Sequence, residues 1–338
     1  MIRTFFRLFT HIQLMPILES GEETLVGGQA VMEGVMMRAP HSYCVAVRKQ
    51  SGEILTMETP LPRLSEKYPI LGKPILRGVA TLGHAMALGI KALKFSADVA
   101  LHEEAQKEAE KKGKVLETKG TTPAGTVPGW LMAANLVFSL VFFIFLYKFI
   151  PLLLTQWLVS YVPAVENQFL FNAVDGVIRL AIFCGFLFAI SRTPDIRRVF
   201  QFHGAEHKVV FNFESRTPVT VENAQAFSTF HPRCGTSFLL VVMLVSIVVY
   251  TMFPVQGFLE KFILRLATLP LIAGLSYELI RYSAKHQGNL LALLVAPGLW
   301  LQRVTTQPPS NEQTEVAIHA LERAMALEVE QGGEAVIA

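Results

Sequence analysis

From residue 130 onward, hydrophobic positions gather into long stretches that contain few polar residues. Four of them are apolar and long enough to predict helices that cross a lipid bilayer: residues 130–150, 169–190, 237–253 and 262–280. A further apolar stretch, 290–301, is shorter and is interrupted by Pro297 and Gly298. We expect it to form a re-entrant or interfacial segment rather than a fifth span.

The N-terminal part of the chain has a different pattern. Two short runs, residues 43–48 and 53–58, flank a turn at Gln50–Gly52 and predict a β-hairpin. Apolar residues recur near helical spacing over 74–100, but this stretch is too short to cross a bilayer comfortably, so we expect a helix along the membrane or packed on the bundle. The predicted fold is an α-helical membrane protein of about four transmembrane helices with a small N-terminal α+β cytoplasmic domain.

The same patterns predict five segments in chain order. These are an interfacial amphipathic helix (1–20), an α+β domain with a membrane-associated helix (21–100), a charged linker (101–128), a four-helix membrane domain (129–304) with a loop at 191–235, and an amphipathic tail (305–338). We expect the tail to form a helix that packs on the cytoplasmic domain.

Composition and charge support a protein embedded in a lipid bilayer. Hydrophobic residues make up 51% of the 338 residues and charged residues 17%, and the mean hydropathy is +0.40. A net charge of +3 is too small to indicate a nucleic-acid partner. Lys and Arg gather in 191–235 and are absent from 151–168, which predicts a cytoplasmic loop and two cytoplasmic termini in the bacterial inner membrane. The three cysteines are too few and too far apart for a disulfide scaffold.

The chemistry of the chain centres on the sequence from Phe202 to Lys208. His203 and His207 are four residues apart, so a helix would place both imidazoles on one face, where they could bind one metal ion. Glu206 lies between them at the position of a general base. His-x-x-Glu-His is the pattern of the inverted zinc proteases, and it predicts a zinc site.

Several other residues are candidates for the same site. His231 and Cys234 supply two further ligand types that zinc favours, and Glu278 is a candidate third ligand, with an ion pair as its alternative. Arg233 or Lys208 would hold an anionic substrate or an oxyanion.

Two further pairs of charged residues lie outside this region. Glu33 and Arg38 are candidates for a contribution to the site, with a surface ion pair near a turn as the alternative for each. Asp175 and Arg179 lie four residues apart inside a predicted span, where charges are costly. We expect them to form an intrahelical ion pair near the outer end of the helix.

Three functions fit these residues. The first is a membrane-embedded zinc hydrolase, for example a peptidase. In it His203 and His207 bind the metal with Glu278 or His231 as the third ligand, and Glu206 activates water. The second is a structural metal site in which His203, His207, His231 and Cys234 form a closed clamp on a scaffold protein. In the third, the same residues form a hydrogen-bonded polar core without metal, in a transport-related or partner-binding protein. The substrate or protein partner is unidentified in each case.

Five stretches together are similar to the YqhQ family of uncharacterised bacterial membrane proteins. They are residues 27–38, 202–208, 231–238, 276–278 and 297–302. The resemblance extends from about Thr24 into the tail. It implies a bacterial inner-membrane protein, and because the family has been listed as predicted metal-dependent enzymes, it implies the same metal site.

Overall fold

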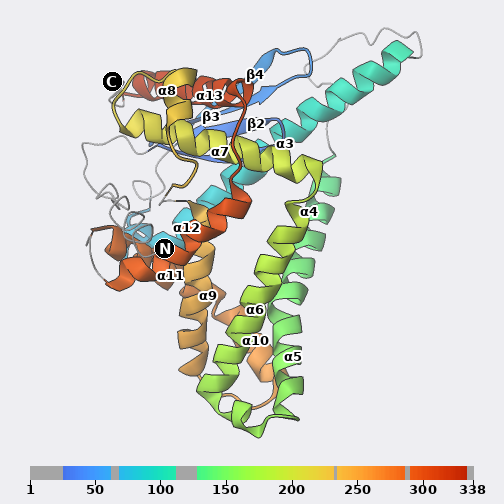
Figure 1. Ribbon diagram of the computed structural model, residues 1–338, viewed down its shortest axis with the longest axis vertical. Coiled ribbons are helices and arrows are strands. Elements are labelled where there is room, and N and C mark those ends of the chain that lie inside the picture. Colours follow the sequence, from blue (N-terminus) through green and yellow to red (C-terminus); the bar gives the residue numbers. More distant parts are fainter. Residues whose placement is uncertain (1–25, 62–67, 112–127, 232–233, 286–289, 333–338) are drawn as a thin grey trace.

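The computed structural model describes residues 26–61, 68–111, 128–231, 234–285 and 290–332. It is mostly helical, with one small antiparallel sheet from the N-terminal part of the chain (Figure 1). The predicted interfacial helix at 1–20 lies outside the described residues.

The sheet has four strands in chain order, each antiparallel to the next. They are β1 (Gly27–Val31), β2 (Gly34–Arg38), β3 (Ser42–Arg48) and β4 (Ile54–Pro60). The hairpin formed by β3 and β4 confirms the sequence prediction. The hairpin of β1 and β2 was not predicted, because its turn at Met32 and Glu33 lacks the usual Asn-Gly signal. Glu33 instead adopts the left-handed conformation itself, with φ of 52°.

Helices cover both faces of the sheet. On one face, Val35, Met37 and Cys44 pack against α7 (Pro194–Glu214) and α13 (Asn311–Glu330). On the other, Met36, Tyr43 and Val45 pack against α3 (Leu76–Lys111). The two faces follow the alternation of side chains along a strand. Because both are covered, β2 and β3 are apolar at nearly every position.

The remaining elements connect these layers to a set of apolar helices that extend away from the sheet (Figure 1). In chain order, the connecting elements and the apolar helices together are η1 (Pro69–Gly72), α4 (Gly129–Ile144), η2 (Phe145–Phe149), α5 (Ile150–Val159), η3 (Pro163–Glu166), α6 (Gln168–Ile190), α8 (Val221–Ala226), α9 (Gly235–Thr251), α10 (Phe258–Ala267), α11 (Leu269–Lys285) and α12 (Leu290–Thr305).

Two helices are long and apolar enough to span a membrane. One runs from α4 through the π-helical η2 into α5 and has 31 residues, and the other is α6, with 23. A third candidate exists if α10 and α11, which are bent by 50° at Thr268, count as one broken span. The apolar part of α9, Phe238–Thr251, is shorter. Four spans therefore remain a prediction.

The structure corrects one expectation and extends two others. α12 is one continuous helix through Pro297 and Gly298, whereas we expected an interruption at these two residues. α3 continues to Lys111, which makes the beginning of the predicted charged linker helical. The tail forms α13, which packs on β2, β3 and β4.

Gly204 lets the segment after α12 cross α7 at very short range. A Cβ at this position would overlap the backbone oxygen of Gln307. The Gln307 N–H also donates to the oxygen of Phe200 at 2.9 Å, which fixes the crossing. The helix contains glycine here because the neighbouring backbone occupies the space of a side chain.

We predict that Gly204→Ala destabilises the protein although alanine is the better helix former. The overlap with Gln307 should cost about 1–3 kcal/mol, more than the ~1 kcal/mol that helix propensity returns. The matched control is Gly83→Ala in α3, where an added Cβ meets nothing within 4 Å and should raise stability slightly. Thermal unfolding of both variants in one detergent is the measurement, and equal melting temperatures would contradict this account.

Candidate metal centre

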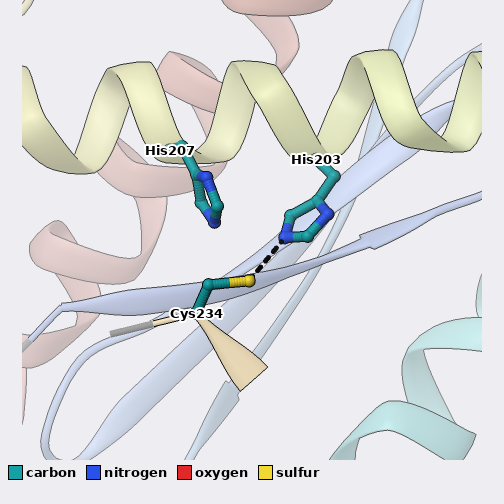
Figure 2. A group of neighbouring side chains, drawn as sticks. All are labelled: His203, His207 and Cys234. Carbon is teal, nitrogen blue, oxygen red and sulfur yellow. Dashed lines mark hydrogen bonds between the residues drawn. The ribbon is translucent and has the colours of Figure 1, made fainter. Parts of the chain in front are cut away.

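Helix α7 presents His203, Glu206 and His207 toward one point beside the sheet. The helical spacing predicted from the sequence is present, and the centroids of the two imidazole rings lie 4.4 Å apart. Figure 2 shows both rings projecting from the same side of the helix. His207 is 2% exposed and Glu206 7%, so the site is formed in the protein interior.

Cys234 reaches the two histidines from the beginning of α9. It occupies the N-cap position of this helix, and its Sγ lies 3.3 Å from His203 Nε2 (Figure 2). One ligand atom each from His203, His207 and Cys234 lies within 4.8 Å of the others. Zinc–nitrogen bonds of about 2.0 Å and zinc–sulfur bonds of about 2.3 Å would require only small movements of these side chains.

Hydrogen bonds to the backbone fix the tautomer of both imidazoles. His203 Nδ1 lies 2.8 Å from the oxygen of Thr305, and His207 Nδ1 lies 2.5 Å from the oxygen of Thr229. A carbonyl oxygen can only accept, so Nδ1 carries the proton in each ring. Both Nε2 atoms therefore present a lone pair, the arrangement found in metal-ligating histidines.

Glu206 faces the same two nitrogen atoms. Its Oε2 lies 3.6 Å from His207 Nε2 and 3.9 Å from His203 Nε2, too far for direct hydrogen bonds. Gly28 in β1 makes room for this side chain, since a Cβ there would lie 2.6 Å from Glu206 Cγ. The carboxylate is thus held between the sheet and the histidines.

His231 lies behind the cluster rather than in it. Its ring centroid is 5.5 Å from that of His207, and its Nε2 is 3.5 Å from a carboxylate oxygen of Glu214. Burial lowers the pKa of His231 to about 4, so the ring is neutral at physiological pH. The backbone N–H of His231 donates to the side-chain oxygen of Gln302, and the side-chain N–H of Gln302 donates to the backbone oxygen of His231. Gln302 is fully buried. His231 therefore anchors the loop that leads to Cys234.

The structure brings neither Glu278 nor Lys208 to the metal ligands. Glu278 forms an ion pair with Arg77 and accepts a hydrogen bond from the N–H of Ile75. Lys208 donates to the oxygens of Gln225 and Phe227, so it holds the loop after α8. Arg233 lies outside the described residues.

The two candidates from the first hairpin are also placed away from the ligands. Glu33 pairs with Arg198 at the start of α7 through two bonds of 2.5 Å, as the surface ion pair alternative predicted. Arg38 ends β2 on the face that packs toward α3, and burial lowers its pKa.

Sequence reasoning missed the partners that orient the cluster. The carbonyl groups of Thr229 and Thr305 are backbone atoms, which no residue pattern identifies. Gly28 is one of two adjacent glycines in β1, and such a pair is visible in the sequence. Its contact with Glu206, however, follows only from the packing of β1 on α7.

Comparisons with known proteins identify relatives but no activity. The family model described as Protein of unknown function (DUF1385) matches residues 73–327, which contain all three candidate ligands. The Uncharacterized protein YqhQ of Bacillus subtilis (strain 168) is 36% identical over 304 residues, covering 89% of this chain and 92% of that protein. No solved structure matches the chain.

We predict that the purified protein binds about one zinc ion per chain through three side chains. His203→Ala, His207→Ala and Cys234→Ala should each lose the metal, because each removes one converging ligand. Glu206→Gln should retain it. Elemental analysis of the protein purified in detergent, with and without added zinc, is the measurement.

Two further variants serve as controls. His231→Gln and Glu278→Gln should both keep the metal, because these side chains lie outside the cluster. Loss of zinc in His231→Gln at normal yield would instead indicate a closed four-ligand clamp. The absence of metal from every sample would refute the metal site.

Proposed function

This chain belongs to the DUF1385 family, and from the geometry of its site we propose that it is a membrane-embedded, metal-dependent hydrolase that uses zinc. The single observation that supports the proposal is the convergence of two imidazole lone pairs, one thiol and one carboxylate on a buried point. Imidazole nitrogen, thiolate sulfur and carboxylate oxygen are the ligand types that zinc binds in proteins.

The arrangement of ligands favours a catalytic site over a structural one. Structural zinc sites have four protein ligands, whereas catalytic sites have three and keep one position open. Here His203, His207 and Cys234 form a set of three, and His231 is held elsewhere by Gln302 and Glu214. Glu206 stands beside the two histidines, where an open position would lie.

Each side chain has a distinct role in the proposed reaction. When bound, zinc would act as a Lewis acid that lowers the pKa of water toward neutrality and polarises a substrate carbonyl group. Glu206 accepts the proton of the attacking water at Oε2 and delivers it to the leaving group. Thr229 and Thr305 keep both imidazoles in the tautomer that binds metal. The substrate class that fits this chemistry is an amide or ester bond, with peptides as one example.

We propose that the site lies at the cytoplasmic surface of the bacterial inner membrane. Cys234 directly precedes the apolar helix α9. The connection from residue 191 to 235, which contains α7 and α8, is rich in Lys and Arg. Counting α9 and the bent pair α10–α11 as spans would give four crossings and two cytoplasmic termini.

One observation favours a second candidate, a scaffold without enzymatic activity. The histidines bind the backbone of two segments that are far apart in sequence, at Thr229 and Thr305. A site that only pinned these segments to α7 would use the same bonds. The two candidates differ in the role of Glu206, which the scaffold does not need as a base.

We predict that Glu206→Gln keeps zinc but loses hydrolysis. Glutamine matches the shape of the carboxylate but cannot accept the proton, so the rate should fall by about 100-fold or more. The measurement is cleavage of fluorescein-labelled casein and of p-nitrophenyl acetate by zinc-loaded protein. Glu278→Gln is the control, because this carboxylate is occupied by Arg77.

The outcomes separate the two candidates. Cleavage by the wild type that depends on both zinc and Glu206 would support the hydrolase. Bound zinc with no cleavage of either probe, or with cleavage unaffected by Glu206→Gln, would favour the scaffold.

A further inference from the structure

A second polar cluster joins the apolar helices α6, α9 and α10, which extend away from the sheet (Figure 1). Asp175 in α6 is fully buried and pairs with Arg179 one turn later, as predicted. The sequence did not predict that Arg265 from α10 also donates to Asp175, at 2.6 Å. Arg179 donates to Ser246 as well. Two guanidinium groups, 3% and 2% exposed, thus share one carboxylate.

A third cation approaches the same place from an irregular part of the longest apolar helix. Lys148 lies in η2, the π-helical turn before Pro151, and its Nζ donates to the hydroxyl of Tyr250 at 2.9 Å. Proline removes one helical hydrogen bond, which accounts for a widened turn here. Such π-helical turns are frequent at functional sites. The Tyr250 ring also lies 5.4 Å from Arg179 and 5.3 Å from Arg265.

An open pocket reaches this cluster from the end of the bundle. It is small and open to solvent on one side. Its polar lining includes Lys261 and Arg265, one turn apart on α10, together with Gln168, Asn172 and Tyr250. Lys261 and Arg265 therefore face the pocket from the same side of the helix.

Positive charge exceeds negative charge around the pocket. Among the described residues, the cations Arg179, Arg265 and Lys261 face two carboxylates, Asp175 and Glu166. An imbalance of this kind is costly in an apolar bundle unless a ligand compensates it.

Donor groups remain available on the pocket wall. Within the described residues, the Arg265 guanidinium makes one hydrogen bond, to Asp175, so most of its N–H groups are unused. Lys261 Nζ lies 3.9 Å from the centroid of the Phe171 ring and makes no hydrogen bond in this part of the chain.

We propose that this pocket binds a phosphate group, with Lys261 and Arg265 as its principal ligands. A guanidinium group matches two oxygens of a phosphate, and the ammonium group of Lys261 would neutralise a further charge. Arg179 adds positive charge from behind. The bend between α10 and α11 resembles the broken helices that surround binding sites in membrane proteins.

The phosphate can come from a lipid headgroup or from solution. Phe171, Phe253 and Leu264 line the same pocket and would accommodate the apolar neighbours of a headgroup. Free phosphate would need only the polar lining.

The test compares both sources with the full-length protein in neutral detergent. Radiolabelled inorganic phosphate is measured by equilibrium dialysis at fixed ionic strength. Phosphatidylglycerol is measured by native mass spectrometry, with a diacylglycerol of the same chain length as the phosphate-free reference. The variants are Lys261→Gln and Arg265→Gln, and Lys91→Gln, an exposed lysine of α3, removes one positive charge elsewhere.

We expect Lys261→Gln and Arg265→Gln to weaken binding at least about tenfold, and Lys91→Gln to leave it unchanged. Binding of inorganic phosphate would identify a site for the free ion, and retention of phosphatidylglycerol alone a headgroup site. Lys261→Gln leaves the Asp175 pairs intact, so its result stands even if Arg265→Gln fails to fold. No binding in either arm, or equal binding by wild type and Lys261→Gln, would overturn the proposal.

Discussion

The burial of α7 is the constraint on which the candidate metal centre depends. The helix lies beside α13 on one face of the sheet, and residues 204–210 are all buried. Polar groups in such a position must find partners inside the protein, because they lose their contacts with water. His203 therefore bonds to the backbone oxygen of Thr305, and His207 and Lys208 bond to backbone oxygens in the segment 225–229. The bonds that satisfy these side chains also fix their orientation, so the site is organised before any ligand arrives.

The local part of this arrangement could be predicted from the sequence. The spacing of His203, Glu206 and His207 requires only one turn of helix, and the β3–β4 hairpin requires only short-range signals. Non-local contacts decided the rest. For a catalytic site the sequence favoured Glu278 or His231 as the third ligand, but the structure brings Cys234 to the two histidines, while Gln302 holds the backbone of His231. Glu278 pairs with Arg77, about two hundred residues away in sequence, and no pattern indicates this contact.

Helix α9 joins the two polar sites of the molecule. Cys234 precedes its first residue, and Tyr250 lies one residue before its end, so the helix separates the two by roughly 25 Å. The Asp175 cluster fixes the far end of α9 through Ser246 and Tyr250. Displacement of Tyr250 along the helix axis would therefore be transmitted to the backbone of Cys234.

The packing of α13 has a consequence for the order in which the chain can fold during synthesis. The sheet leaves the ribosome early, but Ala317, Leu321 and Met325, which cover one of its faces, are made after every apolar helix. The carbonyl group that orients His203 belongs to Thr305, which is also made late. Until then the nascent sheet exposes an apolar surface, a state prone to misassembly. The candidate site is therefore complete only after translation, when the last helix has packed against the first strands.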